Sequence, residues 1–250
     1  MLISTATATA LEREATHLVD DQPYTGREYI GSAPKPGTAD YGKSVAGDDA
    51  PQAYLVIQPP HSVTRPHFHQ TNQFQLFVGG GGSVGKLRAD PLTVQYAGGN
   101  TPYGPIVAED DGMHYFTLRQ AWDSGAKYLP AESHMLVKGQ QRQVVGVKSN
   151  SGTAPVHDDD GALATEFLIE PTPDGLVVQW LALPAGGKST LPDAAAGGGQ
   201  YHVVVSGTLA RAGQDLPALS VEFASADEGE VEVEAGADGL ELVLLRFPKG

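Results

Sequence analysis

Apolar and polar residues alternate over short segments along most of the chain, which predicts β-strands. Residues 92–96 (Leu-Thr-Val-Gln-Tyr) place three apolar side chains on one face of a strand. Residues 230–234 alternate glutamate with valine, which predicts a strand with one face in water. Gly, Pro, Asn and Asp residues separate such segments at short spacing. The pattern therefore predicts an all-β protein.

Helical patterns are confined to two short segments. Residues 9–18 are predicted to form a short N-terminal helix and residues 130–138 a second one. Residues 150–163 have the composition of a loop, and we expect them to cross from one half of the chain to the other. Neither predicted helix is long enough to form a layer of its own.

The two halves of the chain repeat each other. Residues 73–80 (Gln-Phe-Gln-Leu-Phe-Val-Gly-Gly) correspond to residues 200–207 (Gln-Tyr-His-Val-Val-Val-Ser-Gly) at an offset of 127. The same offset relates Leu92 to Leu219, and with the offset shortened by one, residues 54–57 match residues 180–183. Several matches in one register indicate an internal duplication.

Composition narrows the classes of partner. The formal net charge of −14 argues against nucleic acid and anionic membranes, since polyanions are held by clusters of Lys and Arg. Residues 1–150 carry 14 acids and 12 bases, whereas residues 151–250 carry 16 acids and 4 bases. The chain has no cysteine, which excludes disulfides and thiolate chemistry. No segment has the length of a membrane helix or the pattern of a signal peptide, so we expect a cytoplasmic protein.

Two histidines carry the strongest chemical signal. His67 and His69 are separated by one residue, so on a strand they share a face. Gln73 follows four residues later. Two imidazoles and a carboxamide on one face form half of a metal site or the floor of a polar pocket. Both histidines are missing from the repeated half, so the fold does not need them.

These residues resemble the cupin superfamily. The spacing His67-x-His69-x3-Gln73-x6-Gly80 fits the first cupin motif with Gln in place of Glu. Residues 97–105 (Ala-Gly-Gly-Asn-Thr-Pro-Tyr-Gly-Pro) are similar to a stretch of the second motif, with Tyr103 where its last histidine stands. The resemblance covers about residues 50–120 and again 178–247, which implies a bicupin with two jelly-roll β-barrels.

The repeat and the resemblance together predict the domain boundaries. We expect an N-terminal extension over residues 1–49 and a first cupin domain with the working site over residues 50–125. A linker with the leading strands of the second half would span residues 126–175. A second cupin domain, without the histidine pair, would span residues 176–250.

By the family pattern, the metal ligands would be His67, His69 and Gln73. The resemblance implies a single divalent metal such as Fe, Ni, Mn or Zn, bound weakly or absent because a neutral amide replaces the carboxylate. Tyr103 and His114 are the candidate catalytic residues, as a ligand or a proton-transfer group.

Four further residues are expected to line the substrate pocket. Arg65 lies beside the histidines and could pair with a carboxylate. Gln75, Phe77 and Gln95 are predicted to belong to pocket-forming strands. In the second half, Gln200 and His202 could line a small polar cavity.

Three functions are compatible with these features. The first is an enzyme on a small organic molecule, of dioxygenase or isomerase type if a metal is present. The second is a metal-free protein that binds or senses a small molecule. The third is a structural or interaction module. A homodimer is expected, because jelly rolls often pair through sheet edges.

Overall fold

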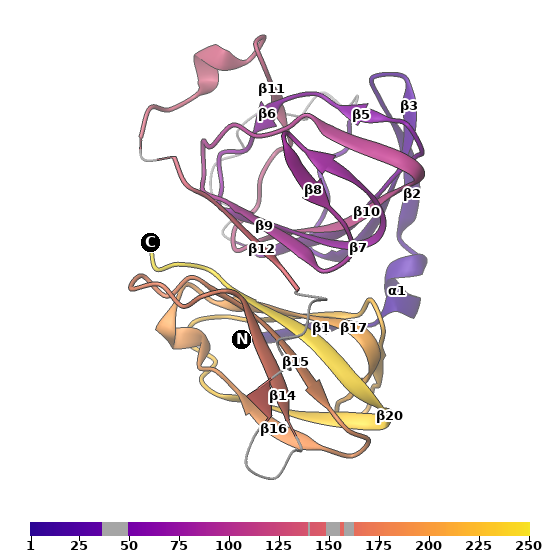
Figure 1. The fold of residues 1–250 in the computed structure, drawn as a ribbon, viewed down its shortest axis with the longest axis vertical. Helices are drawn as coiled ribbons and strands as arrows, with labels where there is room; N and C mark the ends of the chain where they lie inside the picture. The colour runs from indigo at the N-terminus through magenta and orange to yellow at the C-terminus, as the bar shows by residue number, and fades with distance from the viewer. Residues whose placement is uncertain (37–49, 140, 149–155, 158–162) are drawn as a thin grey trace. The chain divides into compact units, whose positions relative to one another are not determined.

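The computed structural model describes all residues except 37–49, 140, 149–155 and 158–162. Strands dominate the described residues, so the predicted all-β class is confirmed. The chain forms two compact units (Figure 1). The first barrel is the unit Arg13–Val145, and the second barrel comprises Met1–Glu12 and Gly146–Gly250.

The described part of the first barrel contains one large antiparallel sheet. Its strand order is β12-β9-β7-β10-β4-β3-β2, with β5 beside β10 and β8 beside β7. The separate strands β6 and β11 pair with each other. The bounds are β2 Glu14–Val19, β3 Gln22–Ile30, β4 Gln52–Gln58, β5 Val63–Thr64, β6 His67–Phe68, β7 Gln73–Val84, β8 Leu87–Ala89, β9 Thr93–Ala97, β10 Ile106–Arg119, β11 Lys127–Tyr128 and β12 Gln143–Val147.

The described part of the second barrel repeats this arrangement. Its order is β1-β19-β17-β20-β15-β14-β13, with β16 beside β20 and β18 beside β17. The bounds are β1 Leu2–Thr5, β13 Val156–His157, β14 Ala164–Ile169, β15 Val177–Leu183, β16 Lys188–Leu191, β17 Gln200–Ala210, β18 Leu216–Pro217, β19 Val221–Ala224 and β20 Val231–Arg246.

Backbone geometry supports the internal duplication. Gly80 and Gly207, 127 positions apart, have φ of 64° and 69°. A Cβ on Gly80 would lie 2.1 Å from the carbonyl oxygen of Gly112, so the close approach of the strands at this bulge requires glycine. Leu92 and Leu219 have matching positive φ values of 66° and 65°.

The predicted match of residues 54–57 with residues 180–183 is wrong by one position. Thr117 pairs with Tyr54 in the first barrel, and its counterpart Leu244 pairs with Gln179 in the second. Tyr54 therefore corresponds to Gln179 and not to Trp180, which is an offset of 125 instead of 126. Sequence similarity favoured the match of two aromatic residues, whereas strand pairing decides which side chain faces inward.

The two predicted helices are largely wrong. An α-helix, α1, covers Thr7–Leu11, but residues from Glu14 onward form strand β2. The second predicted segment contains only a short 3-10 helix, η1, at Ser133–Met135. A second 3-10 helix, η2, covers Ala194–Ala196. Pairing with a neighbouring strand outweighs the weak helix propensity of such short segments.

The predicted N-terminal extension contributes to both barrels. Strand β1 pairs with β19 of the second barrel, whereas β2 and β3 pair at the edge of the first. Strand β12, from the predicted linker, lies beside β9 of the first barrel. The predicted crossing loop over 150–163 lies mostly outside the described residues.

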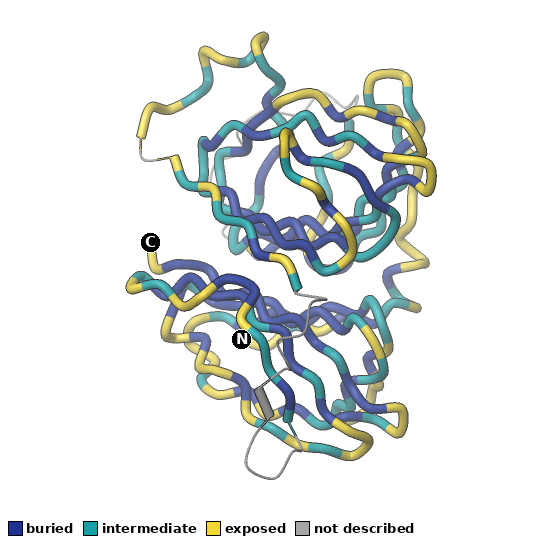
Figure 2. Tube along the Cα trace, viewed as in Figure 1, coloured by how far each residue is buried: buried dark blue, intermediate teal, exposed yellow. Residues whose placement is uncertain are grey.

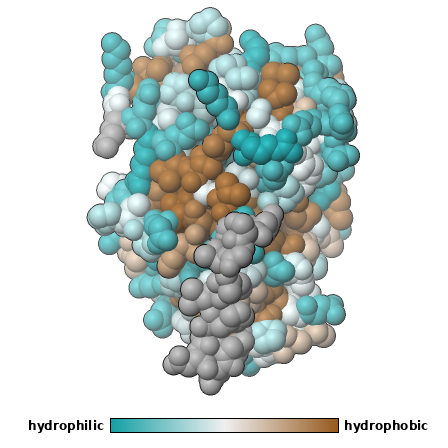
Figure 3. Space-filling view, in the orientation of Figure 1, coloured by the Kyte–Doolittle hydropathy of each residue, from teal (hydrophilic) through white to brown (hydrophobic). Residues whose placement is uncertain are grey.

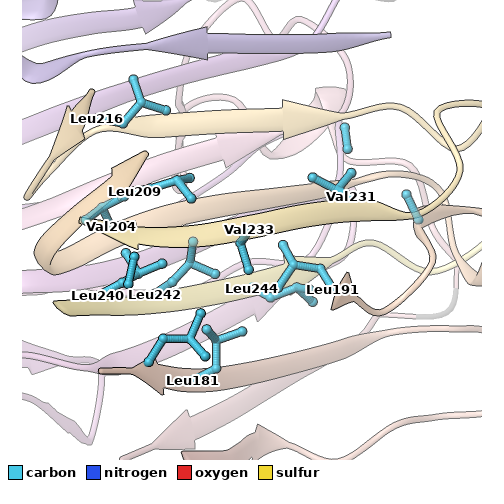
Figure 4. Packing of buried hydrophobic residues seen from close by; sticks show 14 of the residues in the cluster. Leu181, Leu191, Val204, Leu209, Leu216, Val231, Val233, Leu240, Leu242 and Leu244 are labelled. Atoms are coloured by element: carbon cyan, nitrogen blue, oxygen red, sulfur yellow. The ribbon is translucent and has the colours of Figure 1, made fainter. Parts of the chain in front are cut away.

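Consecutive residues are buried in strands such as β7, β9 and β19, whereas alternation is clear at the start of β20 (Figure 2). Val231 and Val233 are buried while Glu232 between them is exposed, as the alternation predicted. The interior of the second barrel is filled by leucine and valine side chains, which point toward one another in Figure 4. Some apolar side chains are nevertheless exposed, among them Leu18, Val137 and Phe167, and Figure 3 shows brown areas among teal ones on the face it draws. No helix among the described residues is long and apolar enough to cross a membrane.

Candidate ligand-binding site

Side chains from strands β4, β10 and β7 form parallel rows inside the first barrel. The first row consists of Gln52, Arg119 and Gln73, which are direct cross-strand partners. All three are 0 to 1% exposed. The guanidinium of Arg119 donates to the Oε1 atom of Gln73 from Nη2 at 2.9 Å, and its Nη1 donates to Gln52. A buried cation thus lies between two neutral amides.

The next row is also polar. Tyr54, Thr117 and Gln75 are cross-strand partners, and Gln75 pairs in turn with Gln95 on β9. The Nη1 atom of Arg119 donates to the hydroxyl of Tyr54 at 3.1 Å, which links this row to the first. Because alternate residues of a strand share a face, the three strands present both rows to the same interior.

The third row, which lies farther along the strands from Arg119, is less polar. Tyr115 pairs with Val56 and Phe77. Phe77 packs in an apolar cluster with Met113 and Ile106. The barrel interior therefore changes from charged to apolar along the direction of its strands.

A cavity of about 160 Å³ lies against these rows. Its lining includes five tyrosines, three histidines, Gln75 and Thr117 as well as charged residues. The lining residues are Arg13, Ala15, His17, Val19, Tyr24, Thr25, Gly26, Glu28, Ala33, Pro34, Lys35, Pro36, Tyr54, Val56, Thr64, His67, His69, Gln75, Tyr103, Tyr115, Thr117, Gly125, Ala126 and Tyr128.

His67 is held in one tautomer by its neighbours. Its Nδ1 atom lies 2.8 Å from the carbonyl oxygen of Arg65, which can only accept, so Nδ1 carries the proton. Its Nε2 atom therefore accepts from the hydroxyl of Tyr103 at 2.9 Å. Burial, and secondarily the neighbouring His69, lowers the pKa of His67 to about 3. The imidazole is neutral at physiological pH.

His69 is neutral for a related reason. Its Nδ1 atom lies 2.7 Å from a carboxylate oxygen of Asp123, and its Nε2 atom lies 3.3 Å from Nη2 of Arg119. Burial, followed by the charge of Arg119, lowers the pKa of His69 to about 4. The Nδ1–H group donates to the carboxylate. Because Nη2 of Arg119 also lies 3.1 Å from Nδ1, the guanidinium packs against the imidazole ring and not on the lone-pair axis of Nε2.

Tyr103 connects the histidine pair to Gln73. Its backbone pairs with that of His67, through N–O distances of 3.0 and 3.1 Å. The Nε2 atom of Gln73 donates to the Tyr103 hydroxyl, whose own proton goes to His67. Burial raises the pKa of Tyr103 well above its ordinary value, so the phenol is a hydrogen-bond donor and not a base near neutral pH.

Three buried charged residues of this site were not among the predicted site residues. Arg119, Asp123 and Lys127 are each at most 2% exposed. Burial would raise the pKa of Asp123, but His69, Arg119 and Lys127 together hold it well below its usual range. Two backbone N–H groups, of Gln70 and Gly125, also donate to this carboxylate at 2.9 Å. Burial lowers the pKa of Lys127, and Asp123 opposes this effect. The only sequence signal was the repeat of Leu118-Arg119 as Leu245-Arg246.

The donors do not fit a divalent metal in this arrangement. The described residues contain no cluster of three His, Asp, Glu or Cys side chains suited to a metal. The lone pair of His67 faces the hydroxyl of Tyr103, the oxygen of Gln73 accepts from Arg119, and the guanidinium of Arg119 lies against the ring of His69. Two unit charges 4 Å apart repel by about 4 kcal/mol at an effective dielectric constant of 20, and a divalent ion doubles this cost. The guanidinium is the cation of this site.

The structure brings only some predicted residues to the cavity. His67, His69, Gln75 and Tyr103 line it. Gln73 lies directly behind them through its bond to Tyr103.

The other four predicted residues do not line the cavity. Arg65 is on the surface, paired with Asp20 at 2.6 Å, although its guanidinium also lies over the ring of Tyr128. Phe77 belongs to the apolar cluster, and Gln95 contacts Gln75 from outside the lining. His114 precedes the inward-facing Tyr115 and therefore points to the opposite face of β10.

The fold has many relatives among solved structures. A putative dioxygenase from Nostoc punctiforme has a TM-score of 0.65 at 11% identity, over 98% of this chain and 83% of that one. Oxalate decarboxylase from Lactobacillus farciminis has a TM-score of 0.62 at 11% identity, over 98% of this chain and 86% of that one. The fold is that of a bicupin. An Escherichia coli pirin in complex with nickel(II) also matches this bicupin, with a TM-score of 0.56, 10% identity and 100% of both chains covered.

Comparisons of the sequence with family models and with curated proteins identify no relative of this chain. No family model matches the chain, and no curated protein matches it. Identities of 10 to 11% to these solved structures establish the fold alone. Function must therefore be argued from the site.

The described residues of the second barrel do not repeat the cavity lining of the first. Leu242 and Leu244 stand at the positions of Tyr115 and Thr117, and they pack in the apolar cluster of Figure 4. Its polar residues form a closed network instead. His202 lies 3.0 Å from Glu222 and from Gln200, and Arg211 donates to Glu222 at 2.6 Å. His202, Gln200 and Glu222 are all 0% exposed.

Proposed function

We propose that this bicupin binds a small organic molecule in the cavity of its first barrel and does so without a metal. The observation that carries the proposal is the position of Arg119. Its guanidinium lies 2.9 Å from the oxygen of Gln73 and 3.1 and 3.3 Å from the two ring nitrogens of His69, so a divalent metal held by these side chains would meet a buried positive charge. The cationic role of a metal is thus filled by a side chain that cannot be removed by chelation.

The size and lining of the cavity support a small ligand. Its volume of about 160 Å³ is close to that of a cavity of about 150 Å³ known to hold benzene. Five tyrosine rings and several aliphatic side chains line the cavity, and a few polar groups can orient a ligand, as in typical small-molecule sites.

Two solved structures of similar fold suggest an alternative function, that of a metal-dependent enzyme. The pirin was solved with nickel(II), and a Bacillus subtilis oxalate decarboxylase has Mn(II) centres. A metal-dependent enzyme of the dioxygenase type would need His67, His69 and Gln73 as ligands. For the reasons given above, we derive no catalytic step through a metal in this chain.

Two measurements test the proposal. Protein purified without a His tag should contain less than about 0.1 equivalent of any transition metal, before and after incubation with Ni(II) or Mn(II). A screen of single-ring compounds should yield ligands that raise the melting temperature equally with and without chelator. A stoichiometric metal, or a ligand effect that chelator abolishes, would overturn the proposal.

A variant based on the second barrel provides the matched control. Thr117→Leu introduces the side chain that the second barrel carries as Leu244, so it should fill the cavity while remaining compatible with the fold. Ligand-induced stabilisation should disappear in this variant. Arg65→Ala, which removes a surface ion pair outside the lining, should leave it unchanged. Equal stabilisation of the wild type and Thr117→Leu would place the ligand elsewhere.

A further inference from the structure

The cavity wall formed by β4, β10 and β7 exposes hydrogen-bond donors. Tyr115, Thr117 and Gln75 line the cavity and are 4%, 3% and 2% exposed. Within the described residues, the hydroxyls of Tyr115 and Thr117 and the Nε2 atom of Gln75 have no hydrogen-bond partner. These three atoms are not among the fully buried orphaned atoms of the described residues, so they face the cavity, where they can donate hydrogen bonds to a ligand.

A chain of amides fixes the orientation of Gln75. The Nε2 atom of Gln143 donates to the oxygen of Gln95 at 3.0 Å, and the Nε2 atom of Gln95 donates to the oxygen of Gln75 at 3.2 Å. The oxygen of Gln75 is therefore occupied, and its N–H groups remain for the cavity. The predicted pocket residue Gln95 would act here as a positioning residue.

Tyr54 provides a fourth donor on the same wall. Its hydroxyl oxygen accepts from Nη1 of Arg119 at 3.1 Å, so its proton is directed elsewhere. Tyr54 and Gln75 flank Thr117 as its direct cross-strand partners. Tyr54, Thr117 and Gln75 thus present three donors in one row of adjacent strands. Tyr115 adds another donor in the next row.

The buried charges next to this wall are predominantly positive. Arg119 and Lys127 carry two formal positive charges and Asp123 carries one negative charge, and all three are at most 2% exposed. Of the charged residues that line the cavity, Arg13 and Lys35 are basic and Glu28 is acidic. A net positive surrounding with four available donors favours a ligand group that is an anion and an acceptor.

We propose that the ligand of this cavity carries a carboxylate, or an equivalent anionic oxygen group, which accepts hydrogen bonds from Tyr54, Thr117 and Gln75. The inference rests on the proposed metal-free binding function and specifies its ligand class. The ring or chain that bears the carboxylate lies against the tyrosines, which form the remaining wall of the cavity. Arg119 stabilises the anion through the Tyr54 hydroxyl without touching it.

Four single-ring probes of similar size test the ligand class. Benzoate, benzamide, benzyl alcohol and benzylamine differ only in the group attached to the ring, and their affinities can be measured by calorimetry at low salt. Benzoate should bind at least about tenfold tighter than benzamide and benzyl alcohol, and benzylamine should not bind. Equal or tighter binding of benzamide, benzyl alcohol or benzylamine would overturn the anionic preference while leaving the proposed function intact.

Two substitutions on β10 test which side chains of the cavity wall bind the carboxylate. Thr117→Val keeps the shape of the side chain and removes the hydroxyl, and Tyr115→Phe removes one phenol oxygen. Thr117→Val should weaken benzoate about tenfold and Tyr115→Phe a few-fold, with smaller effects on benzyl alcohol. Tyr201→Phe, a buried tyrosine of the second barrel, is the matched control and should change nothing. Unchanged benzoate affinity in Thr117→Val would overturn the assignment of the wall. Failure of all four probes to bind the wild type would overturn the proposed function together with this inference.

Discussion

The Tyr103 hydroxyl donates to Nε2 of His67 across 2.9 Å and accepts from the side-chain amide of Gln73. One phenol thus occupies the lone pair that a metal would need on His67. It also joins two residues that are six positions apart in the chain into one buried unit. The consequence is a site with fixed protons and a fixed orientation.

Removal of this phenol oxygen should destabilise the first barrel. Tyr103→Phe leaves the acceptor of His67 and one N–H of Gln73 without a partner, and each orphaned buried group costs about 1–3 kcal/mol. We expect the free energy of unfolding in urea to fall by about 2 kcal/mol or more. Tyr201→Phe in the second barrel provides the comparison. A loss below about 0.5 kcal/mol for Tyr103→Phe would show that the hydrogen bonds of Tyr103 are energetically unimportant.

Stability should decrease with acidification below pH 6.5. The pKa of His67 is lowered to about 3 and that of His69 to about 4, whereas the unfolded histidines titrate near 6.5. Between these values the unfolded state binds more protons, so the free energy of unfolding rises with pH. The stabilisation is complete above pH 6.5 and declines toward pH 4 by at most about 1.4 kcal/mol per pH unit for each histidine.

Urea unfolding between pH 7.5 and 4.5 measures this dependence. The double variant His67→Gln/His69→Gln should show a flatter profile over the same range, even if it is less stable overall. An identical slope in the wild type and the double variant would exclude these histidines as its source. The neighbours of Asp123 hold its pKa low. Asp123 would therefore add to the pH dependence only below about pH 4, where its carboxylate becomes protonated in the unfolded state and its stabilising effect is lost.

The metal preference of the site should depend on Arg119. Gln73→Glu combined with Arg119→Met restores a carboxylate beside His67 and His69 and removes the competing cation. We expect this double variant to bind Ni(II) or Mn(II) at least about tenfold tighter than the wild type in calorimetric titrations, with folding checked by circular dichroism. Tight Ni(II) or Mn(II) binding by the wild type itself would contradict the assignment of Arg119 as the cation of the site.

The closed network of the second barrel should be purely structural. Glu222 is 0% exposed and accepts from Arg211 and His202, and its pKa is lowered to about 2 because these partners outweigh the effect of burial. Glu222→Gln breaks a buried ion pair, which typically costs about 3–5 kcal/mol. We expect a loss of this size in unfolding measurements.

Ligand binding provides the specificity control for that variant. At temperatures where Glu222→Gln remains folded, its affinity for the ligands of the first barrel should equal that of the wild type. Ser4→Ala, which removes a single hydrogen bond to the same carboxylate, should cost about 1 kcal/mol. A loss of ligand affinity in Glu222→Gln would contradict a separate, structural role of the second barrel.

Some expectations from the sequence remain predictions. The dimeric state and the cellular location are among them, as are the roles assigned to Tyr103 and the histidines. The segment from Glu230 to Glu234 behaved as its local pattern indicated, because side-chain alternation is a local property. The helix expected over residues 9–18 failed because pairing of β2 with β3, which is not a local property, decided its conformation.

The sequence by itself determined the strands, the duplication and the positions of His67, His69 and Tyr103 in the first barrel. These follow from side-chain periodicity and from spacing within one short motif, which a linear pattern records directly. Only the tertiary structure decided that Arg119 lies among those donors, 46 residues from Gln73, and that Asp123 and Lys127 join it. Cross-strand register set these contacts, and register depends on which strands meet in space.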